Sequence, residues 1–276
     1  MKRVLTAAVL IPLVLFLVFL GPRWQWLFTV FTALVAGLAA WEYMGLAQRG
    51  GFNPPRIAVL VALLALFAVN FRWPDSTTAV FGVLGLVLLV YCTFFRPVEN
   101  VMADSTASVF CLLYLGLTMI ALPTLHAEAN GPSLVAFLFC VVWVGDIAAL
   151  YVGRAWGRHK LAPKLSPNKT WEGAVGSMAG SLLMAVGLLG LAGLLEQWDS
   201  VILSYPEDIW YWLALAAVVN VAAQVGDLAE SALKRSVGAK DSGTLLPGHG
   251  GVLDRIDALL LAAPALWYAQ VIHQMF

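Results

Sequence analysis

Charged residues are scarce in this chain. Asp, Glu, Lys and Arg make up 12% of its 276 residues, and apolar types make up 61%. Ordinary soluble domains carry roughly a quarter charged residues and half apolar ones. Because apolar runs recur along the whole length, the composition excludes an ordinary soluble domain and indicates a polytopic integral membrane protein. The formal net charge of zero identifies no partner, and nucleic acid is not among the partners that we expect.

Cysteine is almost absent as well. Cys92, Cys111 and Cys140 are far apart and lie in or beside apolar runs. Their spacing matches neither a metal site nor a disulfide framework, so we interpret them as small buried residues in helices. A small-x-small cleavage site is also lacking after the first apolar run, which ends at Leu20. That run is therefore expected to be a retained first span.

Nine apolar segments are candidate membrane-spanning helices, since about 20 residues of helix cross a bilayer core and the ends of the segments are approximate. They are 4–20, 24–46, 56–71, 78–94, 106–122, 133–153, 173–195, 208–233 and 252–274. Glycine, proline or charged residues separate them. The predicted fold is therefore all-α, with about nine transmembrane helices.

Lys and Arg are distributed unevenly between the two sides of these spans. If the N-terminus is inside and the spans alternate, 14 of the 16 Lys and Arg residues fall inside, and Arg23 and Arg72 fall outside. Positive residues mark the cytoplasmic side. The N-terminus is therefore predicted to be cytoplasmic, and the polar loops 154–172 and 234–251 are predicted to share the cytoplasmic face.

Polar groups are also distributed unevenly along the chain. Residues 1–130 carry almost none inside their spans. Glu42 is the exception, and we interpret it as marking an interfacial helix end. Residues 131–276 hold nearly all the intramembrane charge. We predict a scaffold and dimerisation region over 1–130 and a catalytic membrane domain over 131–276.

A polar stripe follows the cytoplasmic end of the span 208–233. Its members, at positions i, i+3, i+4, i+7 and i+8, are Asp227, Glu230, Ser231, Lys234 and Arg235. Residues at these spacings share one helical face, and ionisable residues in a membrane tend to face a cavity or a partner. One interpretation is an internal Asp–Lys pair with cations reaching toward the interface. The other is a site in which Asp227 binds a hard cation and Lys234 and Arg235 bind phosphate oxygens.

Two further carboxylates, Asp254 and Asp257, open the last span three residues apart and so lie on one helical face. Mg²⁺ binds carboxylate and phosphate oxygens and retains some water. Carboxylates from two helices around bound phosphates would therefore suit it. The structural alternative is that these acids complement the dipole at the start of the helix.

A glycine-rich loop joins these two helix ends. Glycines let the backbone approach phosphate, and N–H groups at the start of the next helix favour anions. The candidate substrate-binding residues in the loop are Lys240, Asp241, Gly250 and Gly251. His249 is a candidate hydrogen-bond donor to the substrate, with a structural role as the alternative.

A third group of polar residues lies upstream. Asp146 precedes a seam of small residues in the span 133–153 and could complete a metal site, accept a proton, or be a packed, hydrogen-bonded Asp. Ser166, Lys169 and Thr170 follow in the loop 154–172 and suit a phosphate. Plain attraction to anionic lipid is the alternative for this loop.

The stripe, the loop and the acids after it resemble the signature of the CTP:phosphatidate cytidylyltransferases, also called CDP-diacylglycerol synthases. The matching residues are Ser231-Ala232-Leu233-Lys234-Arg235, Lys240-Asp241-Ser242-Gly243 and Leu246-Pro247-Gly248-His249-Gly250-Gly251-Val252-Leu253-Asp254-Arg255-Ile256-Asp257. Every fixed position agrees. The resemblance is specific over 145–257, whereas over 1–130 it is limited to hydropathy and length.

The resemblance implies an enzyme that converts CTP and phosphatidate to CDP-diacylglycerol and diphosphate in phospholipid biosynthesis. It also implies a requirement for Mg²⁺, with a second cation as a further candidate, a polar funnel-like cavity open to the cytoplasm, and homodimers. We expect the protein in the bacterial inner membrane, with its active site facing the cytoplasm.

Motif spacing assigns roles within that reaction. The predicted catalytic residues are Asp227, Asp254, Lys234, Arg235 and His249. The predicted substrate-binding residues are Ser166, Lys169, Thr170, Ser231, Lys240, Asp241, Gly250 and Gly251. The predicted metal ligands are Asp227, Asp254, Asp257 and Asp146.

Two other functions stay open at this point. A cation- or proton-coupled transporter would use Asp146, Asp227 and Glu230 in the middle of the membrane. The charges, however, crowd at predicted cytoplasmic helix ends beside a glycine-rich loop, which favours an enzyme. Another nucleotide-using enzyme that acts on a lipid phosphate or a polyprenol would share the same phosphate and metal chemistry.

Overall fold

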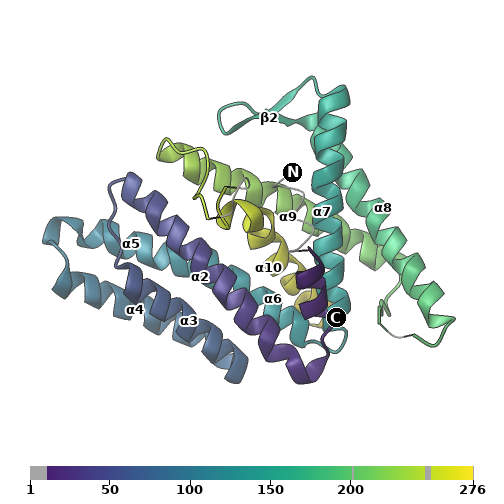
Figure 1. The fold of residues 1–276 in the computed structure, drawn as a ribbon, viewed down its shortest axis with the longest axis horizontal. Coiled ribbons are helices and arrows are strands. Elements are labelled where there is room, and N and C mark those ends of the chain that lie inside the picture. Colours follow the sequence, from purple (N-terminus) through teal and green to yellow (C-terminus); the bar gives the residue numbers. More distant parts are fainter. Residues whose placement is uncertain (1–10, 201, 246–249, 276) are drawn as a thin grey trace. The chain divides into compact units, whose positions relative to one another are not determined.

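The computed structural model describes residues 11–200, 202–245 and 250–275, and helices dominate this part of the chain. The main helices are α2 (Gln25–Arg49), α3 (Arg56–Arg72), α4 (Thr77–Phe95), α5 (Val101–Cys111), α6 (Thr118–Ala127), α7 (Gly131–Trp156), α8 (Trp171–Glu196), α9 (Ile209–Ser236) and α10 (Leu253–Met275) (Figure 1). A π-helical segment, Leu112–Leu117, joins α5 to α6. Short 3₁₀ turns precede α2, α4 and α5.

Seven helical stretches in the described residues are long and apolar enough to cross a membrane. They are Gln25–Arg49, Pro74–Phe95, Val98–Ala127, Gly131–Trp156, Trp171–Glu196, Ile209–Ser236 and Leu253–Met275. The α3 helix is apolar but has 17 residues, and the expected first span, 4–20, lies partly outside the described residues. The predicted helical architecture of an integral membrane protein is confirmed, whereas nine spans stay a prediction.

A small antiparallel hairpin interrupts the helices where the sequence predicts only a polar loop. Strand β1 (Lys160–Ala162) pairs with β2 (Ser166–Thr170), and the register places Lys160 opposite Thr170. Thr170, the last residue of β2, is also the N-cap of α8. Its hydroxyl accepts a hydrogen bond of 3.1 Å from the Gly173 N–H. A threonine cap of this kind satisfies one of the free N–H groups of the first helical turn.

The described chain falls into two compact units. The first is built mainly from residues 23–124 and 233–256, and the second from 12–22, 125–232 and 257–275. Helices α9 and α10 each contribute residues to both units. The predicted division at residue 130 concerns catalytic and scaffold roles, which these contacts do not test, and it stays a prediction.

In the first unit, small residues on α2 form the centre of the core. Ala36, Ala39 and Ala40 are fully buried, and small side chains let helix backbones approach closely. Tyr43 packs against the ring of Phe110 on α5, with ring centroids 5.8 Å apart. This packing places the second half of α2 within the core of the unit.

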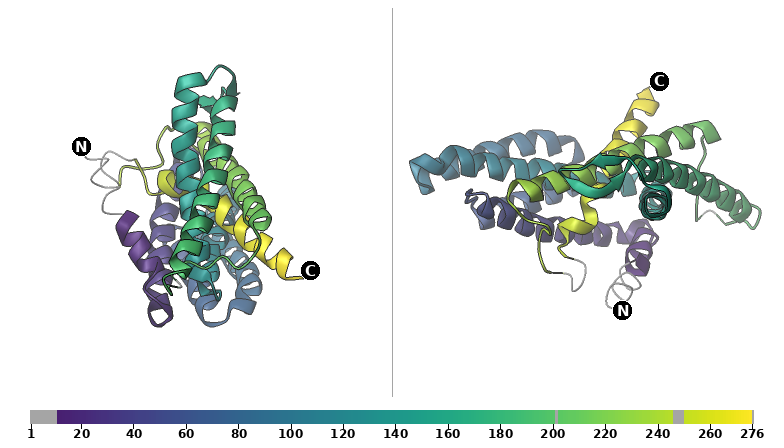
Figure 2. Two further views of the ribbon diagram at one scale, coloured as in Figure 1. Left: turned by 90° about the vertical axis from the view of Figure 1, so that its right-hand side faces the viewer. Right: turned by 90° about the horizontal axis from the view of Figure 1, so that it is seen from above.

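In the second unit, α7 and α8 lie side by side along their lengths (Figures 1 and 2). Glycines on α8 allow the approach, since a Cβ on Gly180 would lie 2.6 Å from the Cβ of Ala148. Asn220 on α9 adds polar contacts by donating hydrogen bonds of 2.8 Å to the hydroxyls of Ser177 and Ser181. Small residues and buried side-chain hydrogen bonds are typical of helix contacts within membranes.

Replacing Gly180 with leucine is expected to destabilise the α7–α8 pair by about 1–3 kcal/mol, because the larger side chain would overpack the contact with Ala148. Thermal unfolding of the purified protein in detergent would measure the loss as a lower Tm. The matched control is Gly187→Leu on the same helix, where a Cβ meets no atom within 4 Å. Equal Tm values for the two variants would contradict the predicted close packing.

Candidate active site

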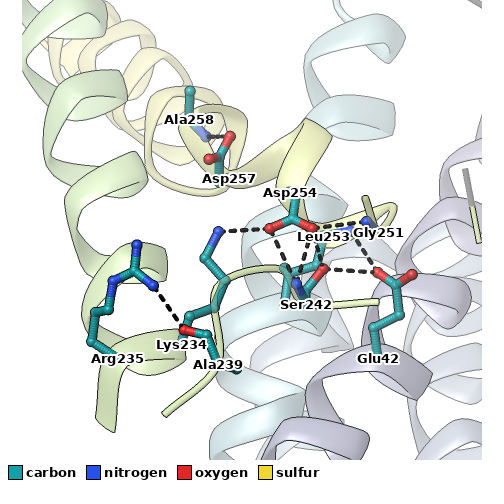
Figure 3. A network of polar contacts seen from close by, with 10 residues as sticks. All are labelled: Glu42, Lys234, Arg235, Ala239, Ser242, Gly251, Leu253, Asp254, Asp257 and Ala258. Atoms are coloured by element: carbon teal, nitrogen blue, oxygen red, sulfur yellow. Dashed lines mark hydrogen bonds and ion pairs between the residues drawn. The ribbon is translucent and has the colours of Figure 1, made fainter. Parts of the chain in front are cut away.

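A buried ion pair lies at the centre of the signature region in the first unit. Lys234 in the last turn of α9 places its Nζ 2.6 Å from Oδ1 of Asp254 in the first turn of α10 (Figure 3). Each residue is 9% exposed. Buried charges are costly unless they are paired, so this contact lets both charges sit in an apolar protein.

Backbone and hydroxyl donors surround the Asp254 carboxylate. Ser242 donates to Oδ2 from its N–H at 3.0 Å and from its hydroxyl at 2.9 Å, and the Gly251 N–H donates to Oδ2 at 2.8 Å. The contact from Gly251, three residues before Asp254, resembles a capping box, in which an acid accepts from an N–H at the helix start. The structural interpretation of Asp254 as an acid that stabilises the start of a helix thus has direct support, and its metal-binding role stays a prediction.

Glu42 joins this network, and its interpretation as an interfacial helix end stays a prediction. Its side chain lies within the first unit, 5% exposed, and accepts hydrogen bonds from the Leu253 N–H at 2.9 Å and the Ser242 hydroxyl at 3.2 Å (Figure 3). The signal for its role was visible in the sequence, because a lone acid inside an apolar span is costly and calls for a partner. The partners themselves lie about 200 residues further on.

The other cations and polar residues of this region lie near the surface of the first unit. Arg235 is exposed and donates a hydrogen bond of 3.0 Å from Nη1 to the carbonyl oxygen of Ala239, just after the end of α9. Lys240 and Asp241 are exposed. His249 lies outside the described residues, so its predicted role stays a prediction.

The second unit holds another ion pair between predicted site residues. Lys169 on β2 places its Nζ 2.5 Å from Oδ2 of Asp227 on α9, and both side chains are partly exposed. The hairpin therefore places Lys169, which the sequence assigns to the loop 154–172, beside the polar stripe of α9. The sequence gives both residues a site role but predicts no contact between them.

Further carboxylates interact with Asp227 in the second unit. The Asp257 carboxyl group lies within electrostatic range of Asp227, Glu230 and Asp146. Gly226 permits this approach of α10 to α9, because a Cβ on it would lie 2.7 Å from the Asp257 carbonyl oxygen. These are oxygen ligands of the kind that Mg²⁺ prefers. Within the described residues, however, no three acidic, histidine or cysteine side chains form a ready metal-binding group.

The remaining predicted substrate-binding residues have mixed positions. Thr170 is 5% exposed and its hydroxyl is used in the cap of α8, so a structural role for it is visible. Ser166 and Ser231 are partly exposed. Gly250 has a φ of +81°, a backbone conformation that favours glycine, which explains why the loop has glycine just before α10.

The comparisons with known proteins agree with the signature. The sequence profile described as "Cytidylyltransferase family" matches residues 1–273. A protein of Synechocystis named phosphatidate cytidylyltransferase is 32% identical over 302 residues, covering 98% of this chain and 96% of the relative. Another with that name, from Staphylococcus haemolyticus, is 30% identical and covers 84% of this chain and 95% of the relative.

A shorter and stronger match is found in Brucella suis. That phosphatidate cytidylyltransferase is 46% identical over 161 residues, which is 56% of this chain. The chain spans about half the length of the Brucella relatives that it matches, 54% in this case. The full-length profile match and the long alignment to the Synechocystis protein show that the chain belongs to the cytidylyltransferase family.

Proposed function

We propose that this protein is a phosphatidate cytidylyltransferase, which joins CTP and phosphatidate to form CDP-diacylglycerol and diphosphate. The observation that carries the proposal is the buried network in the first unit in which the signature residues Lys234, Ser242, Gly251 and Asp254 contact one another. Family membership and the names of the relatives support the same reaction.

The chemistry requires positioning and charge neutralisation more than covalent help from the protein. A phosphate oxygen of phosphatidate attacks the α-phosphorus of CTP. The bond from that phosphorus to the bridging oxygen breaks, and diphosphate leaves with the electron pair. The attacking oxygen is already anionic, so no protein nucleophile is needed. Most of the catalytic benefit then comes from in-line alignment and from cations placed against the developing charge.

Carboxylates of α7, α9 and α10 would hold Mg²⁺. The proposed ligands are Asp227, Asp254, Asp257 and Asp146, and the support is their oxygen chemistry together with their spacing on the helices. Mg²⁺ is commonly held by one or two carboxylates together with substrate phosphates, so the proposed site would be completed by the phosphates of CTP. When bound, the metal would neutralise charge on the leaving diphosphate.

Cations beside these acids would hold phosphate oxygens. Lys234 and Lys169 each pair with one carboxylate of the proposed metal set, Asp254 and Asp227 respectively. A carboxylate and a lysine ammonium group held in contact suit a bound metal–phosphate complex. The carboxylate can face the metal while the ammonium group faces a phosphate oxygen. Arg235, Ser166, Ser231 and His249 are proposed as further phosphate contacts.

The membrane arrangement is part of the same proposal. We propose nine spans, a cytoplasmic N-terminus, a polar cavity that opens to the cytoplasm of a bacterial cell, and a homodimer. The distribution of Lys and Arg along the sequence supports the spans and the orientation. The cavity and the homodimer are what the family resemblance implies. Such an arrangement would let phosphatidate enter from the bilayer and CTP from water.

Incubation of the purified full chain with radiolabelled CTP and phosphatidate is expected to give CDP-diacylglycerol only when Mg²⁺ is present. Removal of the metal with EDTA should abolish the product, and added Mg²⁺ should restore it. Polyprenyl phosphate serves as the matched acceptor control. Product from polyprenyl phosphate alone would favour the rival lipid-phosphate enzyme, and no product from either acceptor would contradict a cytidylyltransferase activity.

A further inference from the structure

Glu42 is the one buried acid of α2 and lies in an apolar stretch long enough to cross a membrane. An ionisable side chain in such a place is costly and is usually retained for a function. Its residue type is not explained by its own helix, because the partners of its carboxylate are Ser242 and Leu253.

The first contact fixes the start of α10. Leu253 is the first residue of that helix, and its N–H is one of those that lack a partner within the helix. Glu42 Oε2 accepts from this N–H at 2.9 Å. A carboxylate at this end of a helix is also favoured by the helix dipole. Glu42 therefore sets where α10 begins, one residue before Asp254.

The second contact links Glu42 to Asp254 through one hydroxyl group. Ser242 Oγ lies 3.2 Å from Glu42 Oε2 and 2.9 Å from Asp254 Oδ2 (Figure 3). A serine hydroxyl has one hydrogen to donate, so it lies between two acceptors that compete for it. The same residue also fixes Asp254 through its backbone N–H. Changes at Glu42 should therefore reach Asp254 through the Ser242 hydroxyl that lies between the two carboxylates.

Two glycines of the signature loop close directly on the Glu42 side chain. A Cβ on Gly243 would contact Glu42 Oε1, and a Cβ on Gly251 would contact Glu42 Oε2, in both cases closer than real Cβ atoms approach other atoms. The loop backbone is thus packed against the carboxylate with no room for a side chain between them. Glycine is therefore required at both positions because any larger side chain would clash with the Glu42 carboxylate.

From these contacts we infer that Glu42 is a positioning residue, which holds Ser242 and the start of α10 so that Asp254 keeps the orientation needed for metal and substrate. The inference rests on the proposed function. Glu42 acts through Asp254 and is not assigned any contact with the substrate. Residues that orient a metal ligand from behind commonly change metal affinity or activity by about 10- to 100-fold when they are mutated.

The main test is Glu42→Ala, with Glu42→Gln as the conservative variant. The alanine variant is expected to raise the Mg²⁺ concentration for half-maximal activity by about 10-fold or more. The glutamine variant keeps one oxygen that can accept from the Leu253 N–H and should recover part of the difference. The matched control is Thr32→Val, a buried residue of the same helix that bonds only to α2 carbonyls, and it should keep the Mg²⁺ dependence of the wild type.

Hydrogen exchange supplies a readout that does not depend on activity. Glu42→Ala is expected to speed exchange of amides in 242–245 and 250–253, measured by mass spectrometry in detergent, while amides of α7 keep their wild-type rates. If Glu42→Ala does not fold, Glu42→Gln and Ser242→Ala decide the question by the same two measurements. Wild-type exchange together with wild-type Mg²⁺ dependence in the folded variants would overturn the inference.

The two proposals fail in different ways. If the wild-type protein forms no CDP-diacylglycerol, the proposed function is wrong, and amide exchange in 242–245 and 250–253 still shows whether Glu42 holds these residues. If the wild type is active and the Glu42 variants differ from it in neither measurement, the inference alone is wrong.

Discussion

Asp254→Asn is expected to lower CDP-diacylglycerol formation by about 100-fold or more, an effect typical of losing a group that stabilises charge in the transition state. The asparagine keeps the size of the side chain. It removes the negative charge that lies 2.6 Å from Lys234 in the wild type. It also places an NH₂ group, which is a donor, beside the N–H groups that donate to the wild-type carboxylate. Turnover measured at saturating Mg²⁺ and CTP tests the expectation. Near-normal Mg²⁺-dependent turnover in well-folded protein would contradict the role of Asp254.

A second variant separates loss of chemistry from loss of stability. Breaking a buried ion pair by removing one partner costs about 3–5 kcal/mol, because the other charge is left unpaired. Adding Lys234→Met to Asp254→Asn removes that charge, so the double variant should regain much of the Tm that the single variant loses. Its activity should stay low, since neither the carboxylate nor the cation is present. Recovery of activity together with stability would assign the pair a purely structural role.

Most of the helical fold is predictable from hydropathy. The expected spans 133–153 and 173–195 correspond to α7 (Gly131–Trp156) and α8 (Trp171–Glu196), because a bilayer demands a long apolar run and that run is visible in the sequence. The hairpin is not predictable in the same way. Strands of three and five residues are too short for alternation to stand out from a polar loop.

The polar stripe of α9 was predictable because helical spacing alone places its residues on one face. The contacts between distant segments were not predictable. The pair between Lys169 and Asp227 joins residues 58 positions apart, and Glu42 meets Ser242 across 200 positions. Such contacts depend on how helices pack, and no local pattern records that. The sequence therefore indicates candidate site residues better than it indicates how they are paired.

The pairing of Lys169 with Asp227 leads to the second prediction with a large effect. Lys169→Met and Asp227→Asn are each expected to lower kcat/KM by about 100-fold, because each removes a charge proposed to hold one metal–phosphate complex. If the two residues act as a unit, the double variant should lose far less than the product of the single losses, since effects of residues that work together are not additive.

The contact at 2.5 Å makes this double-mutant cycle decisive. The matched control is Lys160→Met, a cation of the same hairpin whose side chain is exposed and for which no ion pair is found within the described residues. It should retain wild-type kcat/KM. Losses that multiply fully in the double variant would show that Lys169 and Asp227 act on separate parts of the reaction, and the shared site of the hairpin and α9 would then be wrong. Strong coupling would instead give the hairpin a functional reason, because β2 brings the Lys169 cation into contact with the Asp227 carboxylate on α9.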